Sequence, residues 1–570
     1  MSSNDNLLYS LIQSKIVLNM NCKLLIGLIN LLFNGIIIRY VNLNIIGIAN
    51  IRIKLYYRTI LFISRESLRR HIPKKTNIHS IYHYINIIWL IIPIGLYIML
   101  FSFFLRLFIE KTNNENIYPY YNQACFIYLL SSFIELLSEP FYLLSTITQY
   151  DYIQIYIELI ASIIGYSIQT ILIIRNVESS LLYYGYGYLI YSIIITSINY
   201  IYFIIKRKEE RYYLYIISSL NDLLIKLIYP FVDHKFLNKT INYLKQDIIR
   251  NILIDGHLYI ITIFSLISYE EQAIIYIIYL FDSFFPSLLF STIQQISFHY
   301  FQYLFLTTKL NRTIIKNNQF IQDDDHILLN QREDNISYYQ YNRQPSKPND
   351  ERTIKLNAIT LLNNLIRLIL LISLLLIIFI IPYSSSIINI YIGSNLSINS
   401  NIKIFFCLYL IKILLNGING INESFIQSII SIKQLNNNNL LFYYSIIYLI
   451  LCYLFTKFFG INGIIIINCL NILGRIILNN NIINKYFIRN SWSKSYLFSS
   501  HYIILLLMSL IICYLSKYLI ENCFGQFIFF IGFILTIICL TLIEEKQIIH
   551  YIYCILKLNY NNNKFLFLNQ

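Results

Sequence analysis

The sequence has few charged residues for its length, and this scarcity limits the kinds of protein it could encode. Only 13% of its 570 residues are Asp, Glu, Lys or Arg, whereas 57% are hydrophobic, and the mean hydropathy is +0.57. Soluble domains usually carry about 25% charged residues. The composition therefore excludes an ordinary water-soluble protein and indicates an integral membrane protein.

Closely spaced cysteines are also missing. The nine cysteines occur singly, without any CxxC pair, and most of them lie inside apolar runs. Metal sites and disulfide frameworks usually show cysteines at short, recurring spacings. We therefore expect neither a metal site nor a disulfide framework, and we interpret the cysteines as small apolar side chains.

Long apolar runs, by contrast, are abundant. A helix crosses the ~30 Å hydrocarbon core of a bilayer with ~20 mostly apolar residues. The first run follows a polar opening and lacks a small-residue cleavage site, so we expect it to stay as a span. Five runs meet the required length most clearly: 81–108, 152–174, 184–205, 354–381 and 502–520. Less apolar candidates bring the prediction to about fourteen spans: 16–38, 41–63, 122–144, 250–267, 273–305, 402–432, 440–458, 461–479 and 524–542.

The basic residues gather in predicted loops on one side of the membrane. The chain has 44 Lys and Arg residues and a formal net charge of +15. Cytoplasmic loops are enriched in Lys and Arg, and fourteen spans with both termini in the cytoplasm place most of these residues on that side. They form no single dense stripe, so topology and attraction to anionic headgroups explain them better than nucleic-acid binding does.

A polar stretch divides the predicted spans into two groups. Residues 306–353 include three consecutive acids at 323–325 and the sequence "NRQPSKPND", and they show little periodicity. These features are typical of a flexible linker. We predict an N-terminal membrane bundle of about eight spans in 1–305 and a C-terminal bundle of about six spans in 354–570. Many transporters are assembled from two such halves, although no internal repeat is evident in this sequence.

Several charged residues lie inside the predicted spans, where one charge costs roughly 2.5 to 3.5 kcal/mol on insertion scales. Glu135 and Glu139 are four residues apart, hence on one helix face, and Pro140 predicts a kink beside them. Guanidinium groups around a cavity would suit a diphosphate, because Arg binds phosphate oxygens through paired donors. Internal ion pairing or snorkelling explains the same residues without a substrate, and both interpretations stay open. The main cases are Lys23, Arg52, Lys54, Arg58, Glu135, Glu139, Glu158, Asp282, Arg367, Lys412, Glu423 and Arg475.

Five motifs, spread in order over nearly the whole chain, carry the most specific information. The longest is "NIRIKLYYRTILFISRESLRR" at 50–70. The others are "ELLSEPF" at 135–141, "NGINESF" at 419–425, "GINGIIIINCLNILGRI" at 460–476 and "IEEKQIIH" at 543–550. Together they resemble the eukaryotic Rft family, the dolichol-linked oligosaccharide translocation proteins of the endoplasmic reticulum.

The predicted eighth span departs most from the pattern of that family. Family members typically carry an Asn pair, Gly, Ser and Arg, followed by a Glu pair, where this sequence has "YLFDSFFPSLLFSTIQQISF" at 279–298. Asp282 stands at the Gly and Ser287 at the Arg. Gln294 and Gln295 stand at the Glu pair. The span therefore lacks the charges that the family has there.

The resemblance implies both a fold and a function. The family is similar to the multidrug-exporter and lipid-flippase superfamily, which implies an all-α polytopic membrane protein, with about 14 transmembrane helices in two bundles around a central cavity. The implied function is to move a dolichyl-diphosphate heptasaccharide, of two N-acetylglucosamines and five mannoses, from the cytoplasmic to the lumenal leaflet of the endoplasmic reticulum for N-glycosylation. A supporting role for another flippase is the alternative. The implied partners are this glycolipid and the membrane lipids.

Such transport requires no covalent chemistry, so no catalytic residue, metal or cofactor is expected. An ion-coupled exporter of soluble solutes stays open as an alternative, with Glu135 or Asp282 binding the ion, as does a membrane glycosyltransferase with an acidic site on an outer loop. In the glycolipid interpretation, Arg52, Arg58, Arg65 and Arg69 would guide the diphosphate near the cytoplasmic entrance. The candidate substrate-binding residues are Arg52, Arg58, Arg65, Arg69, Glu135, Glu139, Glu423 and Arg475.

Overall fold

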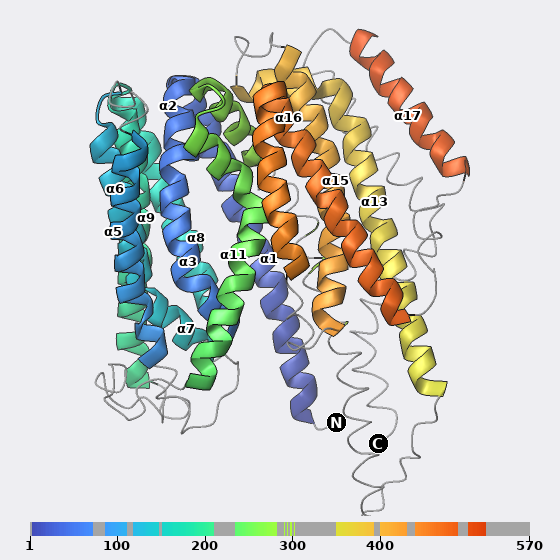
Figure 1. The fold of residues 1–570 in the computed structure, drawn as a ribbon, viewed down its shortest axis with the longest axis horizontal. Coiled ribbons are helices and arrows are strands. Elements are labelled where there is room, and N and C mark those ends of the chain that lie inside the picture. Colours follow the sequence, from blue (N-terminus) through green and yellow to red (C-terminus); the bar gives the residue numbers. More distant parts are fainter. Residues whose placement is uncertain are drawn as a thin grey trace, which may run out of the picture. The chain divides into compact units, whose positions relative to one another are not determined.

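Every regular element that the structure describes is a helix. The computed structural model describes residues 3–71, 86–110, 118–147, 151–209, 234–281, 349–392, 400–429, 439–487 and 500–519, and single positions or pairs between 290 and 301. The first group of helices comprises α1 (Ser3–Tyr40), α2 (Leu43–Gly47), the π-helix η1 (Ile48–Ile53), α3 (Lys54–His71), α5 (Ile91–Glu110), α6 (Tyr121–Leu137), α7 (Glu139–Ile147), α8 (Asp151–Arg175), α9 (Ser180–Glu209) and α11 (His234–Phe264) (Figure 1). Residues 269–281 are also helical. The later helices are α13 (Asn349–Ile392), α15 (Ser400–Ile429), α16 (Asn439–Phe487) and α17 (Ser500–Leu519).

Many of these helices are long and apolar enough to cross a membrane. Within the described residues there are eight such candidates: Asn21–Tyr40, Asn86–Leu107, Tyr121–Ser145, Ile153–Arg175, Ser180–Tyr202, Ala358–Ile378, Ile404–Ser428 and Phe442–Asn484. An all-helical membrane protein is therefore confirmed. The total of about fourteen spans stays a prediction, and the predicted span 524–542 lies outside the described residues.

The helix α16 is a hairpin of two helical segments. Its 49 residues would reach about 74 Å as one straight helix, but Gly460 has φ 57° and ψ −137°, which breaks the helix. The hydroxyl of Tyr444 donates to the carbonyl of Asn471 at 2.9 Å, and that of Tyr448 donates to Oδ1 of Asn468 at 2.6 Å. Because these pairs converge on the turn, the two segments run antiparallel. The break falls between the predicted spans 440–458 and 461–479.

The helices are grouped in two compact units. Unit 1 contains Met1–Leu288, Ser384–Tyr409 and Asn437–Asn471. Unit 2 contains Leu289–Tyr383, Leu410–Asn436 and Ile472–Gln570. The division into bundles at 305 and 354 stays a prediction, and most of the predicted linker lies outside the described residues, although α13 already begins at Asn349.

Unit 1 is built around α6. This helix packs on α9, α5 and α3, while α8 packs on α9 and α1, and α3 packs on α11 (Figure 1). The candidate span Tyr121–Ser145 is 72% buried, more than any of the other seven. The hydroxyls of Ser131 and Ser132 donate to carbonyls one turn earlier in their own helix, so these buried polar groups are satisfied locally.

Unit 2 packs α13 against α17 with apolar side chains. Leu371 and Ile378 of α13 form a buried cluster with Leu506 of α17. The hydroxyls of Tyr383 and Ser516 are hydrogen-bonded to each other. Side-chain hydrogen bonds between apolar helices add to packing where lipid replaces water as the solvent.

Candidate functional site

The helix α3 carries the basic residues of the first motif along one face. Lys54, Arg58, Arg65 and Arg69 are separated by four, seven and four residues, which a helical period of 3.6 places on the same side. That side of α3 faces α6, α7, α9 and α11, because its side chains contact acidic or aromatic residues on each of these helices. The spacing of these residues in the sequence thus places four cations on one interior face of unit 1.

Two of these arginines bind two buried acids. Nη1 of Arg65 lies 2.6 Å from Oε1 of Glu135 and 3.1 Å from Oε1 of Glu139. Nε of Arg69 donates to Oε2 of Glu139 at 3.0 Å, and its Nη2 also contacts that carboxylate. The Tyr57 hydroxyl donates to Glu135. The acid side chains are 7% and 1% exposed, so these pairs supply the partners that a buried charge requires.

The two acids stand on either side of a helix break. The helix α6 ends at Leu137 and α7 begins at Glu139, with Pro140 in the first turn of α7, where its missing N–H leaves no intrahelical bond unmade. The predicted kink beside Pro140 is confirmed. Arg65 therefore holds the last turn of α6 and the first turn of α7 together.

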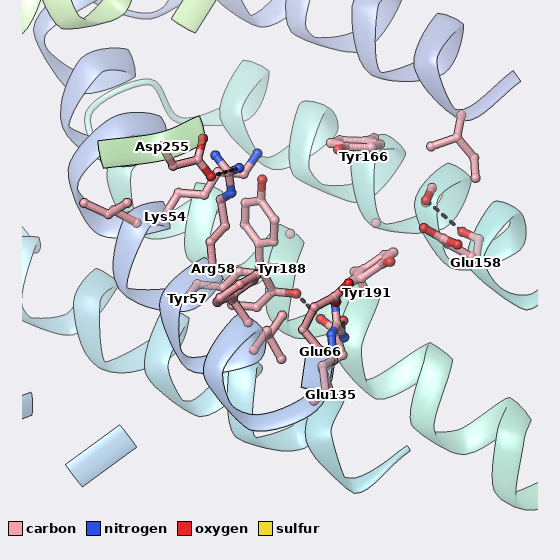
Figure 2. Close-up of a pocket in the computed structure, with 18 of the residues that line it drawn as sticks. Lys54, Tyr57, Arg58, Glu66, Glu135, Glu158, Tyr166, Tyr188, Tyr191 and Asp255 are labelled. Carbon is pink, nitrogen blue, oxygen red and sulfur yellow. Dashed lines mark hydrogen bonds and ion pairs between the residues drawn. The ribbon is translucent and has the colours of Figure 1, made fainter. Parts of the chain in front are cut away.

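A cavity of about 360 Å³ opens next to this network in unit 1. Figure 2 shows Arg58 and Asp255 meeting at one end of it, with Lys54 beside them, whereas Tyr166 and Glu158 lie toward the opposite end. Nη2 of Arg58 is 2.7 Å from Oδ2 of Asp255. The ammonium of Lys54 lies 5.2 Å from the ring centre of Tyr188 on α9, within cation–π range.

The charges around the cavity do not make it basic. Three cations contribute to its lining, and four carboxylates accompany them: Lys54, Arg58 and Arg65, with Glu66, Glu135, Glu158 and Asp255. Arg58 and Arg65 are each bound to one of those carboxylates. The sequence pattern suggested a guanidinium-lined cavity, but interior acids that are distant in sequence offset the arginines.

Tyrosines and small residues form the wall on the side of α8 and α9. Tyr166, Tyr188 and Tyr191 line the cavity there, together with Gln169. The side-chain oxygen of Gln169 lies 2.5 Å from the position that a Cβ on Gly187 would occupy. Because Gly187 has no side chain, the Gln169 amide fills the space beside it. A polar amide therefore lies between α8 and α9 where an apolar side chain would otherwise pack.

The other predicted site residues lie elsewhere. Arg52, in η1, is buried, donates to Oγ of Ser265 at 2.6 Å and stacks 4.9 Å from the ring centre of Tyr269, away from the cavity lining. Glu423 and Arg475 form an ion pair in unit 2. The structure thus brings Arg58, Arg65, Arg69, Glu135 and Glu139 together, and it separates Arg52, Glu423 and Arg475 from the cavity.

The ion pair of unit 2 belongs to a ladder of amides between α15 and α16. Nδ2 of Asn419 donates to Oε1 of Glu423 at 3.0 Å, and Asn419 accepts from Asn479 at 3.2 Å. Asn422 donates to Asn480 at 3.1 Å and is fully buried, so its N-x-S sequon is inaccessible to modification. Polar side chains at these positions join the two helices through hydrogen bonds.

Three of the divergent positions of the predicted eighth span can be placed, and two of them, Tyr279 and Leu280, are helical residues of unit 1. The Gln294 amide occupies the space beside Gly420 of α15, within 2 Å of where a Cβ would lie, so it adjoins the amide ladder. Asp282, Ser287 and Gln295 lie outside the described residues.

The described residues offer no evident metal or disulfide chemistry. No group of three or more His, Cys, Asp or Glu side chains among them is arranged to hold a metal ion. The cysteines that the structure describes are all free: Cys22, Cys125, Cys407, Cys452, Cys469 and Cys513.

Comparison with known proteins places the chain in a family. The family model described as "Rft protein" matches residues 12–554. The chain belongs to the Rft protein family. Rft relatives include a Mus musculus protein, 26% identical over 471 residues that make up 82% of this chain and 80% of the relative. A Dictyostelium discoideum relative is 27% identical over 493 residues, 83% of this chain and 86% of the other. Both relatives are named Man(5)GlcNAc(2)-PP-dolichol translocation protein.

Solved structures of transporters share the all-helical fold of the described part of this chain. The Rft chain is similar to the lipid II flippase MurJ in an inward closed conformation, with a TM-score of 0.59 and 14% identity, over 95% of this chain and all of the other. An inward-facing multidrug transporter of the MATE family matches with a TM-score of 0.52 and 10% identity, over 84% and 99%. At this identity the likeness concerns the fold alone.

Sequence reasoning about this Rft chain missed most of the cavity wall. The sequence marks Lys54 and Glu158 only as charges within predicted spans, and it gives Asp255 and the α9 tyrosines no distinguishing signal. Tyrosine is too abundant here, at 52 residues, for any one of them to stand out. The contact between Arg58 and Asp255 could not be predicted from the sequence, because the two residues lie 197 positions apart in the chain.

Proposed function

We propose that this Rft protein moves the dolichyl-diphosphate heptasaccharide from the cytoplasmic to the lumenal leaflet of the endoplasmic reticulum membrane. It does so as a transporter without covalent chemistry, with about fourteen spans in two bundles and both termini in the cytoplasm. The relatives' name, translocation protein for Man(5)GlcNAc(2)-PP-dolichol, supports this substrate.

The observation that carries the proposal is a polar cavity inside an otherwise apolar helical unit. A diphosphate and seven sugars cannot cross hydrocarbon unaided, because the transfer of their polar groups out of water costs far more than thermal energy. The cavity in unit 1 offers hydroxyls, amides and paired charges among helices that are long and apolar enough to cross a membrane. Such groups replace part of the water that the headgroup loses during transfer.

The candidate residues take two roles in this proposal. Arg58 contacts the headgroup, because 48% of its side chain is exposed and it lines the cavity. Arg65, Arg69, Glu135 and Glu139 shape the end of the cavity through their mutual ion pairs. Arg52, Glu423 and Arg475 act at a distance by holding the helices that surround the transport route.

The test is transfer of the dolichyl-linked heptasaccharide between leaflets of vesicles that contain the purified protein. We expect faster transfer than in protein-free vesicles, and slower transfer with Arg58→Ala at equal protein content. Arg175→Ala, which removes an exposed arginine in the last turn of α8 that does not line the cavity, is the matched control and should transfer normally. Transfer at the protein-free rate, by a protein that still restores glycosylation in cells lacking it, would replace the proposal with a supporting role.

A further inference from the structure

We propose that the cavity of unit 1 is a carbohydrate subsite, which receives uncharged sugar residues of the transported headgroup and excludes the diphosphate. This inference rests on the proposed function, and it assigns one part of the substrate to one part of the chain. It departs from the expectation that the arginines of α3 serve as a diphosphate site.

The first step of the argument is the balance of charge. A diphosphate entering the cavity would meet four carboxylates and three cations, and two of the cations are already bound to carboxylates of the same lining. Interactions between charges are strong where water is scarce. Lys54 alone remains to offset Glu66 and Glu158, so the lining keeps one negative charge in excess, which opposes an anionic ligand.

The second step is the chemistry of the wall. A sugar ring presents hydroxyls that both donate and accept hydrogen bonds, and axial C–H groups that pack on aromatic faces. Tyr166, Tyr188 and Tyr191 supply aromatic faces with hydroxyls, and Gln169 supplies an amide. Paired ions such as Arg58 and Asp255 offer a donor and an acceptor side by side without net charge. The wall therefore matches a polyhydroxylated, neutral ligand.

The third step is size. A volume of about 360 Å³ is near the lower end of the ~300 to 1,000 Å³ that small-molecule pockets span. It suits one or two sugar residues and cannot contain a heptasaccharide. We therefore assign the subsite to one end of the oligosaccharide, while the remaining sugars and the diphosphate stay outside this cavity.

The fourth step is the fixed position of the Gln169 amide in the wall. Gly187 lacks a side chain where the Gln169 amide lies, so the amide occupies a fixed place against α9. A pre-positioned amide discriminates between hydroxyl groups better than a mobile one, because less rotational freedom is lost on binding.

The experiment measures binding to the purified full-length protein by calorimetry, with the soluble Man5GlcNAc2 heptasaccharide and inorganic diphosphate as separate probes. We expect saturable binding of the heptasaccharide that diphosphate does not displace. Gln169→Leu, which keeps the size of the side chain but removes its hydrogen bonds, should weaken heptasaccharide binding ~10-fold. Tyr166→Phe removes only a hydroxyl and provides a second, milder variant that should weaken binding several-fold.

The matched control is Tyr186→Phe, an exposed tyrosine of α9 that does not line the cavity, and it should bind the heptasaccharide normally. Competition by diphosphate, or heptasaccharide affinity that is unchanged in both Gln169→Leu and Tyr166→Phe, would overturn the subsite. A lipid-linked heptasaccharide in vesicles should show the same variant sensitivity in its transfer rate as the free sugar does in affinity.

The two proposals fail in different ways. If the heptasaccharide binds with the expected variant sensitivity but vesicle transfer is not accelerated, the subsite stands and the translocation function does not. If transfer is accelerated and neither Gln169→Leu nor Tyr166→Phe changes transfer or binding, the function stands and the subsite is wrong.

Discussion

The guanidinium of Arg65 lies 2.6 Å from the carboxylate of Glu135 and joins the end of α6 to α3. The same guanidinium lies 3.1 Å from Glu139, the first residue of α7. One side chain thus binds both sides of a helix break in the most buried span of unit 1. Its removal should affect the packing of three helices at once.

Arg65→Ala should destabilise the protein strongly. It leaves Glu135 without its arginine and Glu139 with Arg69 alone, and loss of one partner of a buried pair costs about 3 to 5 kcal/mol. Thermal unfolding of the purified protein in detergent measures the effect. Arg65→Met combined with Glu135→Gln removes both charges and should be less destabilising than Arg65→Ala. Equal unfolding temperatures for the wild type and Arg65→Ala would show that the network contributes no stability.

Tyr57→Phe should have a smaller effect in the same direction. The hydroxyl of Tyr57 donates to Glu135, and a hydrogen bond to a charged group contributes about 1.5 to 3 kcal/mol. Denaturant or thermal unfolding of Tyr57→Phe against wild type checks this. Tyr186→Phe, an exposed tyrosine of α9, should unfold like the wild type. In the double variant Tyr57→Phe with Glu135→Gln, the loss should be less than the sum of the two single losses.

An exchange of Glu423 and Arg475 should destabilise the protein less than the reversal of only one of the two charges. Glu423→Arg or Arg475→Glu alone places like charges together within unit 2, whereas the double exchange restores opposite charges across the same two helices. We expect the double variant to be about 1 to 3 kcal/mol more stable than either single variant. It should remain below the wild type, because Asn419 donates to Glu423 and would then meet a cation. Unfolding temperatures of the four proteins decide the outcome.

Gly460→Ala should destabilise the hairpin of α16. Gly460 has φ 57° and ψ −137°, a region that residues with a Cβ rarely adopt, and such backbone strain costs about 1 to 3 kcal/mol. No side chain lies within 4 Å of the added methyl group, so the loss would come from the backbone rather than from a clash. Phe458→Ala, at a strongly exposed neighbouring position, is the control. An unchanged unfolding temperature in Gly460→Ala would contradict the observed turn.

The spans were largely predictable from composition and periodicity. Apolar runs of about 20 residues follow from the thickness of the bilayer, and α8, α9, α13 and α15 lie where such runs occur. The break beside Pro140 was predictable from that residue alone, because a proline ring clashes with the carbonyl group four residues earlier in a continuous helix. Ends of helices were less predictable, since α13 begins at Asn349, inside a stretch whose composition resembles a linker.

The partners of the charged residues were predictable only in part. Glu135 and Glu139 were expected on one face because their separation fits the helical period. Arg58 was expected at a diphosphate, whereas it binds Asp255, 197 positions away. Pairing of this kind depends on which helices become neighbours, and periodicity within one helix carries no information about that choice.

The turn at Gly460 has a practical consequence for mapping the chain in its membrane. A hairpin closed by a single glycine leaves no loop residues between the two arms of α16, so a protease, antibody or bulky label has no loop to bind there. An epitope inserted there would report on a disrupted hairpin and not on sidedness. Orientation of this region is better read from reporters placed before residue 439 or after residue 487, where the helix has ended.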